Sequence, residues 1–257
     1  MGIDGLHHAR LARGVKRQVS AVHVARLVVV AGLMTSALLG SLSAPPSVSA
    51  DPCADVEVVF ARGTGEPPGV GAVGQVFIDA LRLKVGAKSV GVYGVDYPAT
   101  MDFRTALDGI GDAGHHVERL SAACPNTNVV LGGFSQGAAV MGFVTSAAIP
   151  DGAPTDAPKP MAPEVANHVA AVALFGTPSQ RFMNAIGAPP IIIGPLYMPK
   201  TTELCAPGDP ICSDGGDWSA HNAYTNDGMV DQAASFAAGR LSLNHAGNLV
   251  RTTKNHS

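Results

Sequence analysis

After residue 50, short runs rich in β-branched residues alternate with longer segments of helical period, and this alternation constrains the fold more than any other feature. The pattern predicts strands at 56–61, 89–95, 128–134, 169–176 and 201–205, and helices near 70–85, 103–123, 136–147 and 228–241. Each predicted strand is apolar enough to be covered on both faces, as the strands of parallel sheets are. We therefore expect a three-layer α/β/α sandwich in which helical crossovers connect parallel strands.

A proline-rich stretch, "IPDGAPTDAPKPMAPE" at 149–164, interrupts this pattern. Such a composition is also typical of linkers between domains. Too little chain remains on either side to fold alone, so a surface loop is the better interpretation. We expect residues 51–257 to form a single domain, with 242–257 as a flexible tail.

The first 50 residues have the composition of a secretory signal peptide. Five basic residues precede an uncharged apolar run, "LVVVAGLMTSALLGSLS", and the small residues Val48 and Ala50 then supply a cleavage site. A retained membrane anchor is the alternative, although an apolar run of about 16 residues is slightly short for a span. We expect cleavage after Ala50 and a secreted, extracellular protein, with association with the cell wall as a further option.

All four cysteines follow the expected cleavage site, and an even number in an exported protein indicates disulfide bonds. Four cysteines allow three pairings. Cys205 and Cys212 are seven residues apart within one loop-like stretch, which favours their pairing and leaves Cys53 with Cys124. No spacing of Cys and His residues resembles a zinc site, so we expect neither a metal nor another cofactor.

The charge of the chain argues against one class of partner. Without its first 50 residues, the sequence holds 12 Lys plus Arg against 19 Asp plus Glu, a net charge of −7 when His is neutral. Such a charge repels nucleic acid, and the sequence contains no basic stripe that could capture it. We therefore expect no nucleic-acid partner.

The most informative motif is "VVLGGFSQGAA" at 129–139, in which an apolar strand gives way at once to a helix. Gly133 and Gly137 suit a turn with little room, and Ser135 lies between them. This G-x-S-x-G pattern in this context is the nucleophile elbow of α/β-hydrolases, which exposes the serine hydroxyl. The helix N-terminus offers backbone N–H groups to a developing oxyanion, and Gln136 would supply one. A serine that only caps a helix is the alternative.

A serine hydroxyl needs a neighbouring base that is held by an acid, and in this fold the usual chain order is Ser, Asp or Glu, His. Four histidines follow Ser135. His168 leaves almost no room for an acid before it, and His245 and His256 fall in the polar tail. His221 is therefore the candidate base.

The acid must lie between the serine and the histidine, on a loop rigid enough to orient an imidazole ring. Asp209 lies inside "CAPGDPIC" at 205–212, where a disulfide would clamp the loop after the fifth strand. Asp214 and Asp217 are rivals in the glycine-rich "SDGGDWSA", which has less to fix it. Asp209 is the preferred candidate. Alternatively, Asp209 is only a solvated turn residue that precedes a proline.

Three stretches coincide with one family: "FARGTGE" at 60–66, "GGFSQG" at 132–137, and "CAPGDPIC" at 205–212 followed by His221. In this order and at this spacing they closely resemble the cutinases, especially the secreted bacterial cutinase-like serine esterases. The resemblance covers about 53–241. It implies an α/β-hydrolase with a central five-stranded parallel sheet and no large lid.

The resemblance also implies a role for each motif residue. Ser135 would be the nucleophile, Asp209 the orienting acid and His221 the general base. The oxyanion hole would combine the backbone N–H group of Gln136 with Thr64, which follows Arg-Gly in the first loop. That family position is often serine, and threonine keeps the hydroxyl while adding a methyl group. The resemblance implies the same two disulfides as the spacing favours.

Cutinases bind acyl chains between apolar loops near the triad, and the corresponding stretches here are 96–103 and 215–224, with 189–199 as a third candidate. The resemblance implies a groove lined by four apolar side chains: Tyr97, Met101, Phe103 and Trp218. Each of these side chains could equally be an ordinary core or surface residue.

We therefore expect a secreted serine esterase that hydrolyses carboxylic esters of short to medium acyl chains through an acyl-enzyme. An acetylxylan esterase, a phospholipase or a thioesterase on the same scaffold is the first alternative. From another class, a catalytically silent binding protein of the cell envelope could retain the fold. The expected partner is an ester or lipid substrate. We expect the protein to be a monomer that is free or peripherally associated with the cell envelope.

Overall fold

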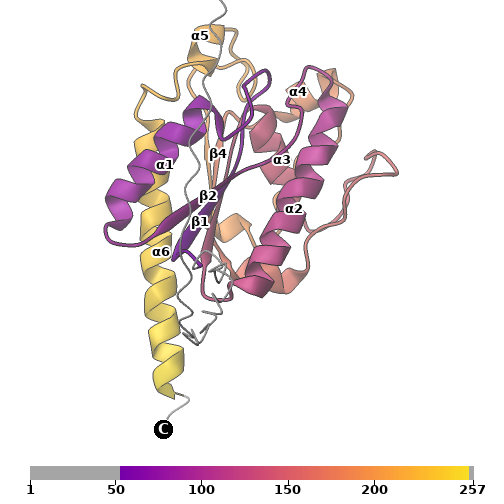
Figure 1. Cartoon of the computed structure of the whole chain (residues 1–257). Coiled ribbons are helices and arrows are strands. Elements are labelled where there is room, and N and C mark those ends of the chain that lie inside the picture. The colour runs from indigo at the N-terminus through magenta and orange to yellow at the C-terminus, as the bar shows by residue number, and fades with distance from the viewer. Residues whose placement is uncertain (1–52, 255–257) are drawn as a thin grey trace, which may run out of the picture. The chain divides into compact units, whose positions relative to one another are not determined.

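A five-stranded parallel sheet forms the centre of the computed structural model, which describes residues 53–254 and not the signal peptide expected at 1–50. The strand order is β2-β1-β3-β4-β5 (Figure 1). The strands are β1 (Val56–Ala61), β2 (Val90–Gly94), β3 (Asn128–Phe134), β4 (Val169–Phe175) and β5 (Thr201–Leu204). Each strand lies within one residue of its sequence-predicted bounds, so the parallel sheet is confirmed.

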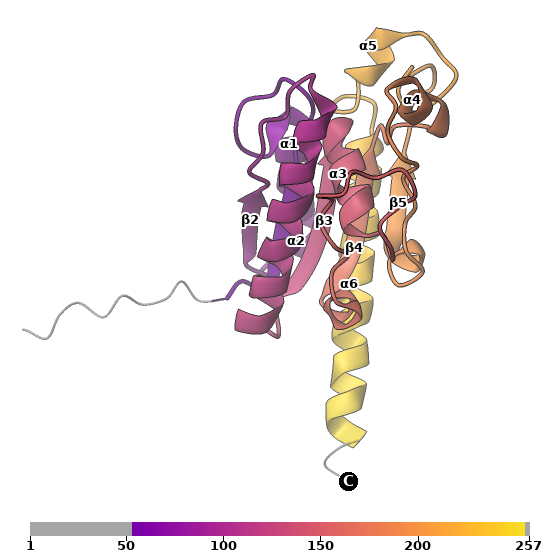
Figure 2. The same ribbon diagram turned by 90° about the vertical axis from the view of Figure 1, so that its right-hand side faces the viewer.

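Helices cover both faces of the sheet and complete the expected three layers. Figures 1 and 2 show α1 (Gly71–Val85) and α6 (Met229–Lys254) on one face, with α2 (Ala106–Ala123) and α3 (Gln136–Val144) on the other. The shorter elements are α4 (Gln180–Ala185), α5 (Trp218–His221) and the 3-10 turns η1 (Phe103–Thr105), η2 (Pro163–Asn167) and η3 (Met198–Lys200). Between β4 and α6 the described chain holds only α4, η3, β5, α5 and loops, without a large lid.

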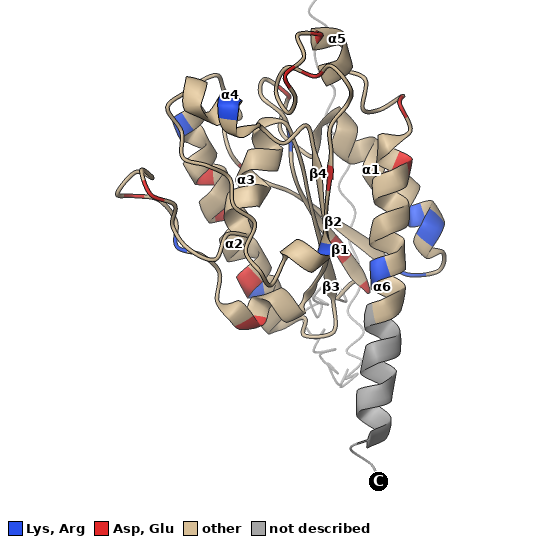
Figure 3. Cartoon of the chain, turned by 180° about the vertical axis from the view of Figure 1, so that it is seen from behind, with Lys and Arg blue, Asp and Glu red and all other residues tan. Residues whose placement is uncertain are grey.

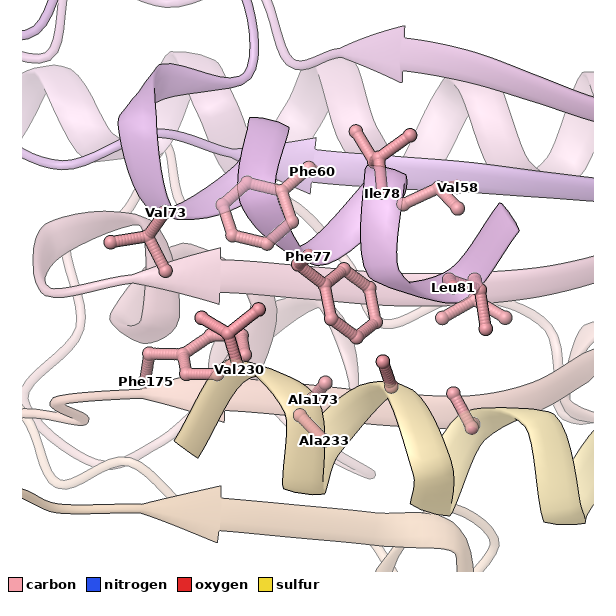
Figure 4. Close-up of a cluster of buried hydrophobic side chains, with 14 of the residues drawn as sticks. Val58, Phe60, Val73, Phe77, Ile78, Leu81, Ala173, Phe175, Val230 and Ala233 are labelled. Carbon is pink, nitrogen blue, oxygen red and sulfur yellow. The ribbon is translucent and has the colours of Figure 1, made fainter. Parts of the chain in front are cut away.

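Successive side chains along each strand point to opposite faces of the sheet, so the core has two halves. In β1, Val58 and Phe60 face α1 and α6, whereas Val59 and Ala61 face α2 and α3. Figure 4 shows the half of the core between the sheet and helices α1 and α6, in which aromatic rings pack against small residues of α6. The rings of Phe77 and Phe175 meet edge to face with centroids 5.8 Å apart. Burial on both faces explains why the inner strands β1, β3 and β4 are nearly continuous apolar runs. The expectation that every strand is covered on both faces is wrong for the edge strands β2 and β5, which are only partly buried.

The helices differ from the predicted ones mainly at their ends. The last helix was expected to end at Leu241 and to leave an irregular tail, but α6 continues to Lys254. The apolar period that marks a core-facing helix ends at Leu241, so the sequence pattern does not reveal the continuation. The helix expected at 103–123 begins as η1 before α2, and α3 ends three residues before its expected end at 147.

The proline-rich stretch at 149–164 is a loop within one domain and not a linker. It leads through η2 into β4, and β4 pairs with β3 in the same sheet. None of the described helices is long and apolar enough to cross a membrane.

Both expected disulfides are present and use all four cysteines. Cys53, just before β1, is bonded to Cys124, which caps the C-terminus of α2. Cys205 follows β5 directly and is bonded to Cys212. The first bond therefore ties the sheet to a helix, and the second closes one short loop at the carboxyl end of the sheet.

We predict that removing the Cys53–Cys124 bond lowers stability more than removing the Cys205–Cys212 bond. A disulfide restricts the unfolded chain more when it closes a longer loop. The cysteines are 71 and 7 residues apart, which corresponds to about 4.4 and about 2.5 kcal/mol in the chain-entropy account. Urea denaturation of the two double-alanine variants measures both free energies of unfolding. A larger loss from the short bridge would contradict the prediction.

Candidate active site

Ser135 lies in a strained turn between β3 and α3, at the carboxyl end of the sheet. Its φ of 55° and ψ of −116° place it where residues other than glycine seldom occur, at a cost of about 1–3 kcal/mol. Within residues 53–254, Ala99 is the only other non-glycine residue with a positive φ. The Ser135 N–H donates to the carbonyl of Phe175 over 2.8 Å, which ties the turn to β4. Strain at this one serine indicates a functional constraint.

The glycines on either side of Ser135 are required by close backbone contacts. A Cβ atom at Gly133 would overlap the carbonyl oxygen of Gly137, and one at Gly137 would overlap the carbonyl oxygen of Ala61. The N-terminus of α3 therefore packs directly on the backbone of β3 and on the end of β1. The G-x-S-x-G motif thus serves packing as well as the turn.

His221 lies at the end of α5, between Ser135 and Asp209. Its Nε2 is 2.9 Å from Ser135 Oγ, and its Nδ1 is 2.8 Å from Asp209 Oδ2. The imidazole ring stacks on Phe134, with ring centroids 5.0 Å apart, and Trp218 meets it edge to face at 6.1 Å. His221 is 9% exposed, so most of this hydrogen-bond chain is shielded from water.

Asp209 is fully buried, and its carboxylate is nevertheless well supplied with donors. In addition to His221, the N–H of Ile211 donates to Oδ1 over 2.8 Å, and the hydroxyl of Tyr224 donates to Oδ2 over 2.6 Å. A buried carboxylate without such partners would cost several kcal/mol. The three donors together fix the orientation of the carboxylate toward His221.

The two rival carboxylates lie on the loops around α5, where Figure 3 shows several acidic residues. Asp214 is almost fully exposed and forms an ion pair with Arg181 at 3.2 Å. Asp217 caps α5 and accepts a hydrogen bond from the N–H of Ser219 over 2.8 Å. Hydrogen bonds from Ser219 lower the pKa of Asp217. In the described structure His221 is hydrogen-bonded to Asp209 and to neither rival.

Tyr224 is a residue of this site that the sequence reasoning missed. Its buried hydroxyl donates to Asp209, accepts from the N–H of Ala206 over 3.1 Å, and lies 3.4 Å from the sulfur of Cys212. Burial, and then the hydrogen bond to Asp209, raises the pKa of Tyr224, so the phenol keeps its proton and remains a donor. No motif or spacing in the sequence marks this tyrosine as part of the site.

Thr64 and Gln136, expected to form an oxyanion hole, both line the pocket that contains Ser135. Gln136 is the first residue of α3, so the helix itself does not use its backbone N–H. Its buried side chain donates from Nε2 to the carbonyl of Thr100 over 3.0 Å, while its Oε1 has no partner in the described structure. The side chain thereby joins α3 to the loop that follows β2.

A buried arginine and a carboxylate hold the loop that carries Thr64. The side chain of Glu66 accepts from the N–H of Gly63 over 2.6 Å and from the N–H of Ala72 over 2.7 Å. Arg62 is 3% exposed and donates to the carbonyls of Glu66, Val95 and Tyr97. The motif "FARGTGE" was recognised in the sequence, but these supporting roles were not. A charged residue directly after an apolar strand, Arg62, with Glu66 four residues later, was the available signal.

The pocket next to Ser135 has a volume of about 630 Å³ and a mostly apolar lining. Three of the four expected groove residues line it: Met101, Phe103 and Trp218. Met101 is 74% exposed and Trp218 is 60% exposed, so both stand at the mouth of the pocket. Their exposure to solvent, beside a buried hydrogen-bond chain, is typical of a binding site for an apolar ligand.

The expectation that Tyr97 lines this groove is wrong. Tyr97 is 3% exposed and packs within the core half on the side of α2 and α3. Its hydroxyl donates to the carbonyl of Arg62, and the guanidinium of Arg62 lies 5.0 Å from the centre of its ring. On the other side, the ring lies against Gly109 of α2. Tyr97 therefore stabilises the loop that carries Thr64 by its contacts with Arg62, and its side chain does not line the pocket that contains Ser135.

No group of three or more His, Cys, Asp or Glu side chains within the described part of the chain could hold a metal ion. The carboxylates of Asp209 and Glu66 at the carboxyl end of the sheet accept hydrogen bonds from protein groups, Asp209 from His221 and Glu66 from the backbone N–H of Gly63. The site thus places a serine hydroxyl, an imidazole and a carboxylate in one hydrogen-bond chain, from Ser135 through His221 to Asp209.

Known proteins provide independent information on this chain. The sequence profile of the cutinase family matches residues 52–241. A relative from Mycobacterium tuberculosis named "Probable carboxylesterase Culp5" is 74% identical over 165 residues, which cover 64% of this chain and 95% of the relative. Another from the same organism, named "Phospholipase Culp4", is 46% identical over 235 residues, which cover 91% of this chain and 97% of the relative.

A solved structure agrees with these matches. A cutinase from Trichoderma reesei, in complex with a phosphonate inhibitor, superposes with a TM-score of 0.58 and 33% identity, over 74% of this chain and 78% of that chain. The α/β-hydrolase fold inferred from the sequence is thus shared with a solved cutinase. Because the family profile spans most of the chain and includes the strand, turn and helix around Ser135, this chain belongs to the cutinase family of ester-hydrolysing enzymes.

Proposed function

We propose that Ser135, His221 and Asp209 form a catalytic triad that hydrolyses carboxylic esters through an acyl-enzyme. The observation that carries the proposal is the continuous hydrogen-bond chain from Ser135 Oγ through both ring nitrogens of His221 to Asp209, with links of 2.9 and 2.8 Å. A serine hydrogen-bonded to a histidine base that a carboxylate orients is a recurring arrangement for acyl transfer. The strained turn at Ser135 supports the same assignment.

The reaction proceeds in two half-reactions. His221 Nε2 takes the hydroxyl proton while Ser135 Oγ bonds to the carbonyl carbon of the ester. The tetrahedral intermediate then breaks its bond to the alcohol oxygen, and the alcohol leaves with the proton from His221. A water molecule attacks the acyl-enzyme with help from the same base, and the carboxylic acid and free serine are released.

Two parts of the site stabilise the charges that develop. The buried carboxylate of Asp209 lies next to the imidazole and stabilises its protonated form in both half-reactions. The backbone N–H groups of Gln136 and Thr64 are assigned to the oxyanion, the first of them at a helix N-terminus. Each such donor typically contributes about 10²- to 10³-fold to kcat.

We assign the acyl group of the substrate to the apolar pocket beside Ser135. Met101, Phe103 and Trp218 line its part next to the triad, and this part suits acyl chains of short to medium length. An ester of a phospholipid is the second candidate, because a relative that matches most of this chain is named a phospholipase.

We further propose that the enzyme is exported and acts outside the cell as a monomer, free or peripherally associated with the cell envelope. The composition of residues 1–50, which lie outside the described residues, supports export. Two disulfides in the folded domain also support it, because such bonds persist mainly in oxidising compartments.

We predict that Ser135→Ala abolishes hydrolysis of p-nitrophenyl butyrate while the protein stays folded. Loss of a triad nucleophile typically lowers kcat by about 10⁴ to 10⁶. Ser242→Ala, on α6, is a matched control that should keep both activity and covalent labelling by a fluorophosphonate. Labelling of the Ser135→Ala variant, or more than a few per cent of its activity with an unchanged circular dichroism spectrum, would show that another serine is the nucleophile.

We predict that Asp209→Asn lowers kcat by roughly 10⁴, because an amide no longer stabilises the protonated imidazole of His221. Asp214→Asn and Asp217→Asn are matched controls with the same chemical change on neighbouring loops. Both should retain kcat within about threefold, since neither carboxylate is hydrogen-bonded to His221. Near-normal activity of Asp209→Asn, with a large loss in one control, would move the acid to that position.

We predict that Tyr224→Phe keeps the fold but moves the acid limb of the kcat/KM profile to higher pH. Without the phenol, the Asp209 carboxylate has one donor fewer, so it holds the protonated form of His221 more strongly. An acid limb that stays in place while stability falls would mean that Tyr224 only fills space.

A further inference from the structure

The loop after β2 contains Ala99, the second strained residue of the described chain. Its φ of 51° lies in the left-handed region that favours glycine, and its side chain is 1% exposed. Such a conformation persists only where the surrounding contacts hold it. Within residues 53–254, Ser135 is the other non-glycine residue with a positive φ. Strain on this loop, as at the serine, indicates a functional constraint.

Two backbone carbonyl groups of this loop hold the two segments that are assigned to the oxyanion. The carbonyl of Ala99 accepts a hydrogen bond from the N–H of Gly65 over 2.7 Å, and Gly65 directly follows Thr64. The next carbonyl, that of Thr100, accepts from Nε2 of the Gln136 side chain over 3.0 Å. Two adjacent residues thus connect the first loop to the start of α3.

The side chain of Gln136 is buried for the sake of this contact. Gln136 is 3% exposed, and its Oε1 has no hydrogen-bond partner in the described structure. A buried amide oxygen without a partner is unfavourable, and an apolar side chain of similar length would avoid that cost. The amide therefore serves the bond that its nitrogen donates more than it serves stability.

The loop that carries the two carbonyl groups is itself fixed on both sides. Toward α2, the hydroxyl of Thr100 accepts from the N–H of Asp102 over 3.2 Å and lies 3.3 Å from the hydroxyl of Thr105. Toward β2, the ring and hydroxyl of Tyr97 contact Arg62. The loop is therefore a firm support for the groups that bond to it.

We propose that Ala99 and Thr100 form a positioning segment that sets the distance between the two N–H groups assigned to the oxyanion, those of Thr64 and Gln136. The proposal rests on the proposed function, because it concerns donors to the oxyanion of ester hydrolysis. Both donors must lie about 2.7–3.1 Å from one oxygen atom, and an error of about 1 Å lowers the rate about 100-fold. The donors come from segments far apart in the sequence. A support that bonds to both segments fixes their separation before a substrate binds.

The test removes the side-chain amide of Gln136 and leaves its backbone N–H in place. Gln136→Met keeps the length of the side chain but cannot donate to the Thr100 carbonyl. We expect kcat for p-nitrophenyl butyrate to fall by about 10- to 100-fold and KM to change by less than about twofold, because the ester oxygen becomes an anion only after Ser135 attacks. Gln75→Met is the matched control on α1, where an exposed glutamine donates to Asp79 over 3.0 Å, and it should keep the wild-type kcat.

Binding of butylboronic acid distinguishes a misplaced donor from a damaged pocket. Ser135 Oγ bonds to the boron atom, the serine proton passes to His221, and the resulting tetrahedral boronate carries the negative charge. In Gln136→Met the Kd of this acid should rise by the same factor by which kcat/KM falls. Inhibition by 1-butanol, which carries no such charge, should stay within about twofold of wild type. Equal weakening of both ligands would mean that the side chain only shapes the pocket, and would overturn the proposal.

Hydrogen exchange tests the link to the first loop directly. In the wild-type protein the N–H of the exposed Gly65 should exchange at least about 100-fold more slowly than in an unfolded peptide. In Gln136→Met it should exchange at least about fivefold faster than in wild type, while the amides of β3 keep their rates. In Gln75→Met all of these rates should stay at the wild-type values.

A second variant covers failure of the first to fold. The amide of Gln136→Asn is one CH₂ group too short to reach the Thr100 carbonyl, so this variant should show the same losses as Gln136→Met. An unprotected Gly65 in wild type, unchanged Gly65 exchange in a folded variant, or a kcat within about twofold of wild type would overturn the proposal. If wild type neither hydrolyses the ester nor is labelled at Ser135 by a fluorophosphonate, the proposed function fails instead. Exchange at Gly65 then still decides whether the segment connects the two loops.

Discussion

The direct packing of Gly137, at the start of α3, on the carbonyl of Ala61, at the end of β1, sets the geometry of the whole site. A helix that begins this close to the sheet leaves room only for a tight turn, and the turn forces Ser135 into its positive φ. The strain costs about 1–3 kcal/mol, which burial of nearly all of α3 offsets. The same contact brings the N-terminus of α3 next to the loop of Thr64. Two segments far apart in the sequence can thus face one oxyanion.

The second constraint is the buried carboxylate of Asp209. Its donors come from its own loop, from His221 at the end of α5 and from Tyr224 after α5, and Tyr224 also contacts Ala206 just past β5. A carboxylate that is dry and fully hydrogen-bonded cannot reorient, and its field acts on His221 with little screening by water. The site is therefore organised before a substrate enters.

The sequence predicts the sheet and the three main residues of the site for different reasons. Strands buried on both faces are continuous apolar runs, so their bounds can be read to within one residue. Ser135 is marked by glycines with a steric role, and chain order leaves His221 as its partner. Tyr97 and Tyr224 show the limit of this reasoning. Both are tyrosines near the motif loops, yet hydrogen bonds to Arg62 and Asp209 that no sequence spacing encodes decide their places.

The proline-rich stretch at 149–164 is the loop that the sequence predicts, and it also lines the pocket. An irregular loop that borders an apolar cavity carries backbone N–H groups, and each unpaired one is costly there. Proline has no N–H and presents an apolar ring, so a loop rich in proline can line such a cavity without that cost. Six prolines from three segments line the pocket: Pro150, Pro154, Pro158, Pro160, Pro178 and Pro189. The composition that is typical of a linker is thus also suited to lining an apolar cavity, and the contact of Pro158 with Gly111 of α2 shows that this loop packs on the domain.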